Sequence, residues 1–106
     1  GNIVAISDWN DTGAGNGILQ PPLVAGPDQV GGVHVYQRRA SEWTQRSLIK
    51  PINPALPFSL FGFKVDLARN GSLLAVGHPA ESSNASGVGG DQDDTSLTNS
   101  GAVWLY

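Results

Sequence analysis

The sequence has no cysteine and no methionine among its 106 residues. Without cysteine, neither a disulfide framework nor thiol chemistry is available to the protein. Because position 1 is not methionine, we expect the chain to be a processed product, a fragment or an excised piece of something longer. The lack of cysteine removes one marker of secretion but does not exclude secretion.

Charge and long apolar runs are also scarce. Charged residues make up 14% of the chain, and the net charge is only −3. Arg38 and Arg39 are the only adjacent basic pair, so the chain has no basic stripe and nucleic acid is not an expected partner. No apolar run approaches the length that crosses a bilayer, so membrane insertion is not expected either.

No segment places apolar residues at spacings of three and four over the length of a helix. The chain is instead 40% hydrophobic with 14 Gly and 7 Pro, which is typical of short strands joined by many turns. The sequence therefore predicts an all-β chain. Six strands are expected, at Ile3–Ser7, Gly31–Arg38, Ser41–Lys50, Phe58–Ala68, Leu73–Gly77 and Ala102–Tyr106.

The segments between these strands carry turn-forming residues. Asp8–Val30 and His78–Ser100 are long and polar, and both are expected to be loops. A turn is expected at Arg39–Ser41, and Asn70-Gly71 predicts a two-residue hairpin turn because both positions tolerate positive φ. Within Phe58–Ala68, alternation predicts one face made of Phe61, Phe63, Val65 and Leu67.

The chain repeats itself with a period of 70 residues. Laid on Gly1–Tyr36 without a gap, Gly71–Tyr106 matches in its apolar runs and at both ends. A fixed period of this length indicates repeated supersecondary units. The identical pairs are Gly1 and Gly71, Ala5 and Ala75, Gly17 and Gly87, Gly31 and Gly101, Val33 and Val103, and Tyr36 and Tyr106.

The repeated unit resembles the FG-GAP repeat of integrin-α-like β-propellers, in its bacterial form. Leu60–Val65 (LFGFKV) is similar to the FG element, and Leu74–Pro79 (LAVGHP) is similar to the GAP element, with His78 where the family has alanine. The loop that follows, from Glu81 to Val103, is also similar. The resemblance is close over 58–106 and weaker over 1–50. It implies four-stranded antiparallel blades and an extracellular or cell-surface protein, often an adhesive one, sometimes with calcium in its loops.

Measured against such blades, the chain holds about one and a half of them. Residues 1–50 supply strands two to four of one blade, 51–57 form a connector stiffened by Pro51, Pro54 and Pro57, and 58–106 supply strands one to three of the next. A propeller closes only with about four to eight blades. We therefore expect either that the chain is cut from a longer array or that neighbouring copies complete one another's blades.

Two loop segments have the alternating oxygen ligands that a calcium ion prefers. The first candidate is Asp91, Asp93, Thr95 and Asn99, and the second is Asp8, Asn10, Thr12 and Asn16. The alternative is that these residues form Asx-type turns without a metal. No other cofactor is expected.

Three triplets match the acceptor signal for N-glycosylation. They begin at Asn10, Asn70 and Asn84, and the first and last lie in the long polar loops. Asn70 is instead expected to serve the hairpin turn. The chain is therefore a candidate glycoprotein.

A catalytic set is not visible. The two histidines, His34 and His78, lie in or at the end of strands, where packing between blades is the expected role. Trp43, Trp104, Tyr36 and Tyr106 are candidates for stacking on sugars, but they recur at equivalent strand positions, which favours packing.

The leading hypothesis is a non-catalytic, extracellular module for cell-surface interaction or adhesion. The alternatives are a subunit of a fibre or ring and a carbohydrate-binding module.

Overall fold

The computed structural model describes residues 1–20, 24–26, 29–53 and 57–106. These residues form strands and no helix, so the prediction of an all-β chain is confirmed. No helix that could cross a membrane occurs in this described part. The strands are β1 (Ile3–Asp8), β2 (Gly17–Leu19), β3 (Gly32–Arg39), β4 (Glu42–Lys50), β5 (Lys64–Leu67), β6 (Leu74–His78) and β7 (Ala102–Leu105).

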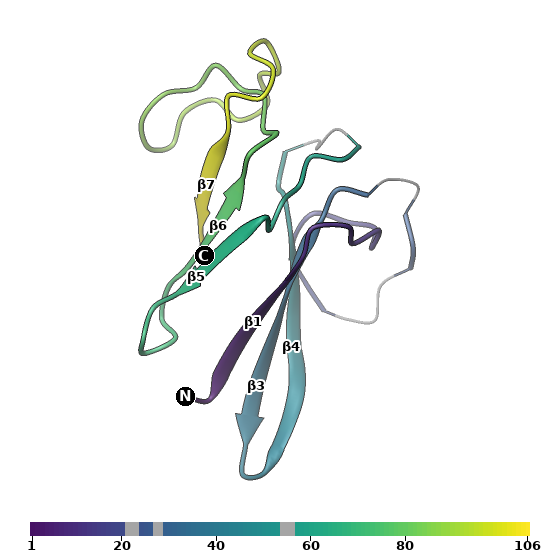
Figure 1. The fold of residues 1–106 in the computed structure, drawn as a ribbon, viewed down its shortest axis with the longest axis vertical. Helices are drawn as coiled ribbons and strands as arrows, with labels where there is room; N and C mark the ends of the chain where they lie inside the picture. Colours follow the sequence, from purple (N-terminus) through teal and green to yellow (C-terminus); the bar gives the residue numbers. More distant parts are fainter. Residues whose placement is uncertain (21–23, 27–28, 54–56) are drawn as a thin grey trace.

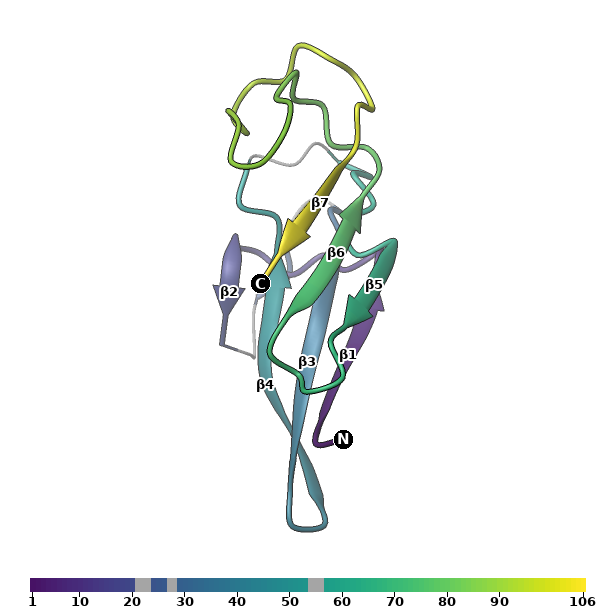
Figure 2. The ribbon, with the colours of Figure 1, turned by 90° about the vertical axis from the view of Figure 1, so that its left-hand side faces the viewer.

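The strands are arranged in two antiparallel sheets (Figure 1). The first sheet has the order β1-β3-β4-β2, and the second has the order β5-β6-β7. Figure 2 looks through the second sheet onto the first and shows that the β3–β4 hairpin extends beyond it. Arg39 pairs with Glu42 at the tip of this hairpin, so the turn predicted at Arg39–Ser41 is confirmed.

Five of the six predicted strands form within one residue of their predicted bounds. The prediction for Phe58–Ala68 is wrong in its first half, because only Lys64–Leu67 pairs with β6. Phe58 and Leu60 take positive φ values of 63° and 60°, which break an extended strand. As a result Phe61 is fully buried while Phe63 is 50% exposed, so these two side chains do not share a face.

Two connections also differ from the prediction. The loop expected at Asp8–Val30 contains β2, whose three residues are too few to show a periodicity but pair with the free edge of β4. The turn between β5 and β6 is longer than two residues, since Ala68 N donates to Leu73 O at 2.8 Å. Only Gly71 has positive φ there, while Asn70 Oδ1 accepts hydrogen bonds from Ser72. Of the predicted connector, Pro54 lies outside the described residues.

The two matching segments fold with the same register. Ala5 pairs with Val35 in the first sheet, and Ala75 pairs with Leu105 in the second, which is the same pairing moved by the period of the sequence. Gly31 and Gly101, which enter β3 and β7, both take positive φ, at 85° and 77°. The repeat in the sequence is therefore a repeat in the structure.

A hydrophobic core lies between the sheets. Its centre is Phe61, which comes from the segment joining the sheets and meets the rings of His78 and Tyr106 edge-on, at centroid distances of 5.5 and 6.4 Å. Edge-on aromatic pairs contribute about 0.5–1.5 kcal/mol each beyond the area they bury. The other buried members are Val33, Val35 and Ile49 from the first sheet, and Leu74, Val76 and Trp104 from the second.

The sheets approach most closely where Gly31 meets Phe61. These residues form a parallel bridge, and Phe61 N donates to Val30 O at 3.1 Å. A Cβ on Gly31 would collide with the carbonyl oxygen of Phe61, so glycine is required by space as well as by φ. This contact explains why the first half of the predicted strand does not form, because the N–H groups of Phe58 and Phe61 donate to the segment just before β3.

Candidate functional site

Two acidic residues, Asp11 and Glu81, occupy equivalent positions just after β1 and β6. The backbone N–H of each donates to the carbonyl three residues earlier, that of Asp8 or of His78, at 3.0 and 3.2 Å. Each backbone carbonyl in turn accepts the N–H of the glycine that enters the next strand, Gly31 or Gly101. The period of the sequence therefore places one carboxylate beside the same end of each sheet.

Each carboxylate also accepts the backbone N–H two residues later. Asp11 Oδ1 accepts from Gly13 at 2.8 Å, and Glu81 Oε1 accepts from Ser83 at 2.9 Å. Side-chain bonds of this kind fix the turn, because they give the backbone a partner outside any strand. The two turns are alike, but the groups that reach each carboxylate from elsewhere in the chain differ.

At the first turn, Lys50 and His34 bind Asp11. Lys50 is fully buried at the end of β4, and its Nζ lies 2.6 Å from Asp11 Oδ1 and 3.2 Å from Asp11 O. His34 Nε2 lies 3.3 Å from Asp11 Oδ2, and Gln45 Nε2 contacts His34 Nδ1 at 2.8 Å. Burial works to raise the pKa of Asp11, but the bonds from Lys50 and Gly13 and the charges of Lys50 and His34 together lower it.

Asp8, Asp11 and His34 bring ligand atoms close enough together to hold a metal ion. Lys50 Nζ already supplies a positive charge at Asp11 Oδ1, so a metal ion there would have to displace a buried ammonium group. The geometry therefore favours a polar cluster that joins the first loop to β3 and β4. Calcium binding by Asp8 together with Asn10, Thr12 and Asn16, which the sequence groups with it, stays a prediction.

At the second turn, Glu81 has amide and hydroxyl partners in place of a lysine. It is 4% exposed, and Asn53 Nδ2 donates to Glu81 Oε1 at 3.1 Å while Ser83 Oγ donates to Oε2 at 2.9 Å. Across the described residues, which include every Lys and Arg, the ion pairs found are those of Asp11. Asn53 is 9% exposed, and its buried Oδ1 has no hydrogen-bond partner among the described residues.

His78 is 1% exposed at the end of β6 and packs between the sheets, as expected for a strand histidine. Trp104 Nε1 donates to His78 Nδ1 at 3.3 Å, which leaves the ring proton on Nε2. Burial lowers the pKa of His78 to about 4, and the charge of Glu81 opposes this shift in part. His78 is therefore neutral near pH 7.

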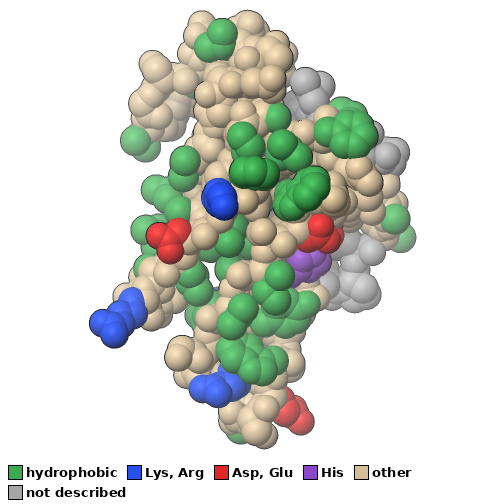
Figure 3. Space-filling model, viewed as in Figure 1, with side chains coloured by type: hydrophobic (Ala, Val, Ile, Leu, Met, Phe, Trp, Pro, Cys, Tyr) green, Lys and Arg blue, Asp and Glu red, His purple; other side chains and the backbone are tan. Residues whose placement is uncertain are grey.

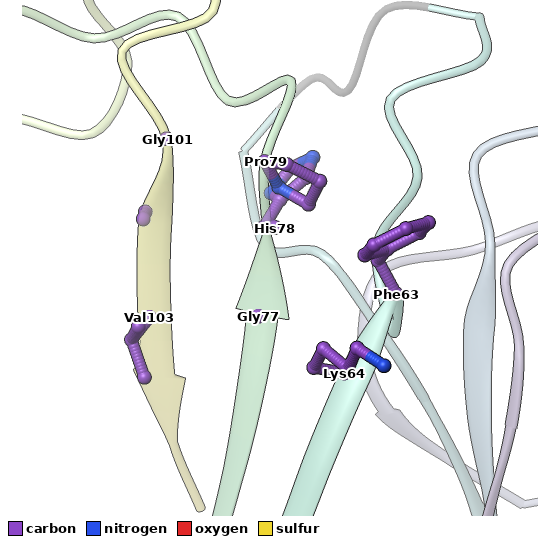
Figure 4. A pocket seen from close by; sticks show the side chains of 8 residues that line it. Phe63, Lys64, Gly77, His78, Pro79, Gly101 and Val103 are labelled. Atoms are coloured by element: carbon purple, nitrogen blue, oxygen red, sulfur yellow. The ribbon is translucent and has the colours of Figure 1, made fainter.

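A shallow pocket of about 380 Å³ lies on the outer face of the second sheet (Figure 4). Phe63 and Lys64 line one side, Gly77 and Pro79 lie along the middle, and Val103 lines the other side. Gly77 lacks a side chain at the centre, which leaves room between β5 and β7. The lining is mostly apolar and carries one positive charge, so it suits an apolar partner surface.

Apolar side chains are exposed on the outer faces of both sheets. Val103 and Leu105 are 70% and 65% exposed on the second sheet, and Val4 and Ile6 are 39% and 51% exposed on the first. Figure 3, in the view that shows the two sheets side by side, shows hydrophobic side chains spread across that side of the molecule with few charged groups between them. These exposed side chains make the two outer faces candidate interaction surfaces.

The exposed faces correspond to the buried ones through the repeat. Val33 and Val35, which are buried against the second sheet, correspond to the exposed Val103 and Leu105. The same holds with the two sheets exchanged. Val76 is buried in the second sheet, and its counterpart Ile6 is exposed in the first sheet. Each outer face is thus the counterpart of a face that already packs against a sheet within this chain.

The remaining predicted site residues lie on exposed loops. Asp91 and Asp93 are joined by an Asx-type bond, in which Asp93 N donates to Asp91 Oδ1 at 3.1 Å. Asn99 has positive φ, and Thr95 is exposed. Calcium binding by this group stays a prediction. Asn10, Asn70 and Asn84 are exposed, which suits glycosylation but does not test it.

The aromatic residues predicted as stacking candidates fall into two groups. Trp104 is 8% exposed in the core, and Tyr106 packs on Phe61, where burial raises its pKa to about 12. Trp43 is 45% exposed at the hairpin tip with the Arg38 guanidinium 5.6 Å from its ring centroid. Tyr36 is partly buried. Packing is thus confirmed for Trp104 and Tyr106, and sugar binding stays a prediction.

The patterns in the sequence did not mark Asp11, Lys50, Asn53, Glu81 or Asp94 as site residues. Asp94 organises the second long loop by accepting hydrogen bonds from Asn84 N and from Ser96, and the bond from Asn84 is the main cause that lowers its pKa. The ungapped alignment could have identified the acidic pair, because Asp11 and Glu81 fall at the same position of the repeat. Lys50 left no such signal, since a lysine at the end of a strand is ordinarily solvated.

Comparison of the chain with models of protein families, with curated proteins and with solved structures finds no match.

Proposed function

We propose that this chain is a non-catalytic, extracellular β-propeller-repeat module of the FG-GAP type that serves cell-surface interaction or adhesion. The observation that carries the proposal is the correspondence between buried and exposed sheet faces. Val33 packs against the second sheet, and its counterpart Val103 is exposed beside a pocket lined by Phe63. A repeat whose outer faces match its inner interface is suited to bind further sheets or protein surfaces.

Adhesion of chain-coated beads to a layer of cells, or to extracellular protein films, tests the proposal. We expect Val103→Glu to reduce bead retention about tenfold, because a charge would be buried in the contact. Val24→Glu is the matched control, since Val24 is 80% exposed and lies outside both sheets. Equal retention of wild-type and Val103→Glu beads, or retention no better than that of uncoated beads, would contradict the proposal.

A second candidate is a subunit of a ring or fibre. The correspondence of faces favours this candidate. The exposed outer face of the second sheet has the residue pattern of the inner face of the first sheet, which is buried within the chain, so it can pack against a sheet of another copy. Such contacts are head-to-tail and give rings if they close and filaments if they do not. Sedimentation over a range of concentrations decides: a chain that stays at 11.1 kDa up to about millimolar concentration rules out this candidate.

A further inference from the structure

No described strand covers the outer edge of β7, and this edge borders a groove. Among the residues that the structure describes, β7 pairs with β6 on one side only, so its other side presents backbone groups that no described strand pairs. The groove beside it has a volume of about 620 Å³ and is lined by all four residues of β7, by the glycine-rich segment 87–90, and by Glu81. Its volume lies in the range of roughly 300–1,000 Å³ that is typical of ligand sites.

The first sheet has a strand at the corresponding edge. There β4 pairs with β3, and Ile49 lies opposite Val33, the counterpart of Val103. Lys50 follows and reaches Asp11, the counterpart of Glu81, through the 2.6 Å bond of its ammonium group. In the second sheet neither the strand nor the lysine has an equivalent among the described residues.

We propose that the β7 edge binds an antiparallel β-strand of a partner chain, and that a lysine at the end of this strand bonds to Glu81. The partner strand has the chemistry of β4: apolar residues paired with Val103 and Trp104, followed by the lysine. This inference rests on the proposed role as a repeat module, and it identifies the kind of partner strand that binds the β7 edge. Strand addition of this kind draws affinity from the backbone and specificity from the side chains.

Two independent observations point to a cationic group. Glu81 is a buried carboxylate whose described partners are uncharged, whereas its counterpart Asp11 is paired with a lysine. Beside it, the buried Oδ1 of Asn53 has no hydrogen-bond partner within the described part of the chain and can accept from an ammonium group. Buried polar atoms are nearly always bonded in native proteins, so this acceptor marks a place for a donor.

One difference between the two sheets affects the fit. Ala102 stands where β3 has Gly32, and a Cβ at Gly32 would lie 2.9 Å from Leu48 Cδ1 and 3.3 Å from Lys50 Cδ. Both atoms belong to flexible side chains, which can move by the few tenths of an ångström that a methyl group requires. The partner strand therefore fits beside Ala102 with small rotations of its side chains.

A peptide with the sequence of residues 41–50, SEWTQRSLIK, is the probe. We expect a fluorescein-labelled form to bind the purified chain, and a form with glutamine in place of the final lysine to bind about tenfold more weakly. On the protein, Glu81→Gln removes the difference between the two peptides. Hydrogen exchange locates the site, with slower exchange expected at Ala102–Leu105 in the complex and no change in β1.

The proposal is overturned if both peptides bind the wild-type chain equally, if neither binds better than a scrambled peptide, or if protection falls elsewhere than on β7. The peptide comparison uses the wild-type chain, so it decides even if Glu81→Gln does not fold. The assay is independent of bead adhesion. Peptide binding without adhesion contradicts the proposed function alone, and adhesion without peptide binding contradicts this inference alone.

Discussion

Lys50 Nζ lies 2.6 Å from Asp11 Oδ1, and the Lys50 side chain is fully buried. The pair joins the end of β4 to the turn after β1, and His34 adds a second contact to the same carboxylate. Because the lysine has no access to water, its ammonium group relies on Asp11 for its hydrogen bonds. This relationship makes the pair the polar centre of the first sheet.

Replacing Lys50 by methionine is expected to destabilise the chain. The change leaves a largely buried carboxylate without its cation, which costs about 3 kcal/mol in similar pairs. The free energy of unfolding, measured by urea denaturation, checks this. Lys64→Met is the matched control and should change stability by less than about 0.5 kcal/mol, since Lys64 is exposed. Equal effects of the two substitutions would show that the Lys50–Asp11 pair does not stabilise the fold.

The lowered pKa of His78 predicts that the folded chain loses stability on mild acidification. Its pKa is about 4 in the folded chain and 6.5 in the unfolded chain, so between these values the unfolded state binds more protons. Stability is therefore full above pH 6.5 and falls as the pH drops toward 4, by a few kcal/mol at most. Urea unfolding at several pH values measures this, and His78→Gln should flatten the profile in that window. An unchanged profile in the variant would contradict the assignment.

The lowered pKa of Asp11 predicts a separate loss of folding stability at lower pH. Its pKa in the folded chain lies below the ordinary value of 3.8, so its contribution is present above that value and is lost as the pH falls through the folded pKa. Asp11→Asn should remove this low-pH decline from the unfolding profile while leaving the decline due to His78. A variant that keeps the full decline below pH 3.8 would show that another carboxylate is responsible.

Substitution of Gly31 is expected to lower the free energy of unfolding more than substitution of Gly87, a second glycine with similar φ. Gly31→Ala combines a positive φ, which costs about 1–2 kcal/mol, with a collision against the Phe61 backbone. Gly87 has φ +79° with no atom within 4 Å of the added Cβ, so Gly87→Ala carries the first cost alone. The difference in the free energy of unfolding between the two variants measures the close approach of the sheets. No difference would mean that the contact relaxes freely.

Phe61 is expected to be the most sensitive of the phenylalanines. Phe61→Ala removes a fully buried ring from the centre of the core and should cost about 3–5 kcal/mol. Phe58→Ala is the control, because Phe58 is 66% exposed. Thermal unfolding of both variants compares the two positions. A similar loss at Phe58 would indicate that the segment before Phe61 packs more tightly than its exposure suggests.

The sequence by itself determined the fold class and the repeat. Alternating and continuous apolar runs fix the positions of β1, β3, β4, β6 and β7 within one residue, because strand periodicity is local. The period of 70 residues predicts the shared register, since equal apolar spacing places equal residues on equal faces. These features need only neighbours along the chain.

Only the tertiary structure decided the rest. Local alternation predicts a strand that begins at Phe58. The N–H groups of Phe58 and Phe61 instead donate to the carbonyls of Gln29 and Val30, which are distant in the sequence. Lys50, Asn53 and Glu81 became candidate residues only when packing removed them from water, because burial and pairing across the fold leave no trace in local pattern. Which apolar faces are covered and which edge is open depends on how two sheets meet, and that contact joins segments distant in the sequence.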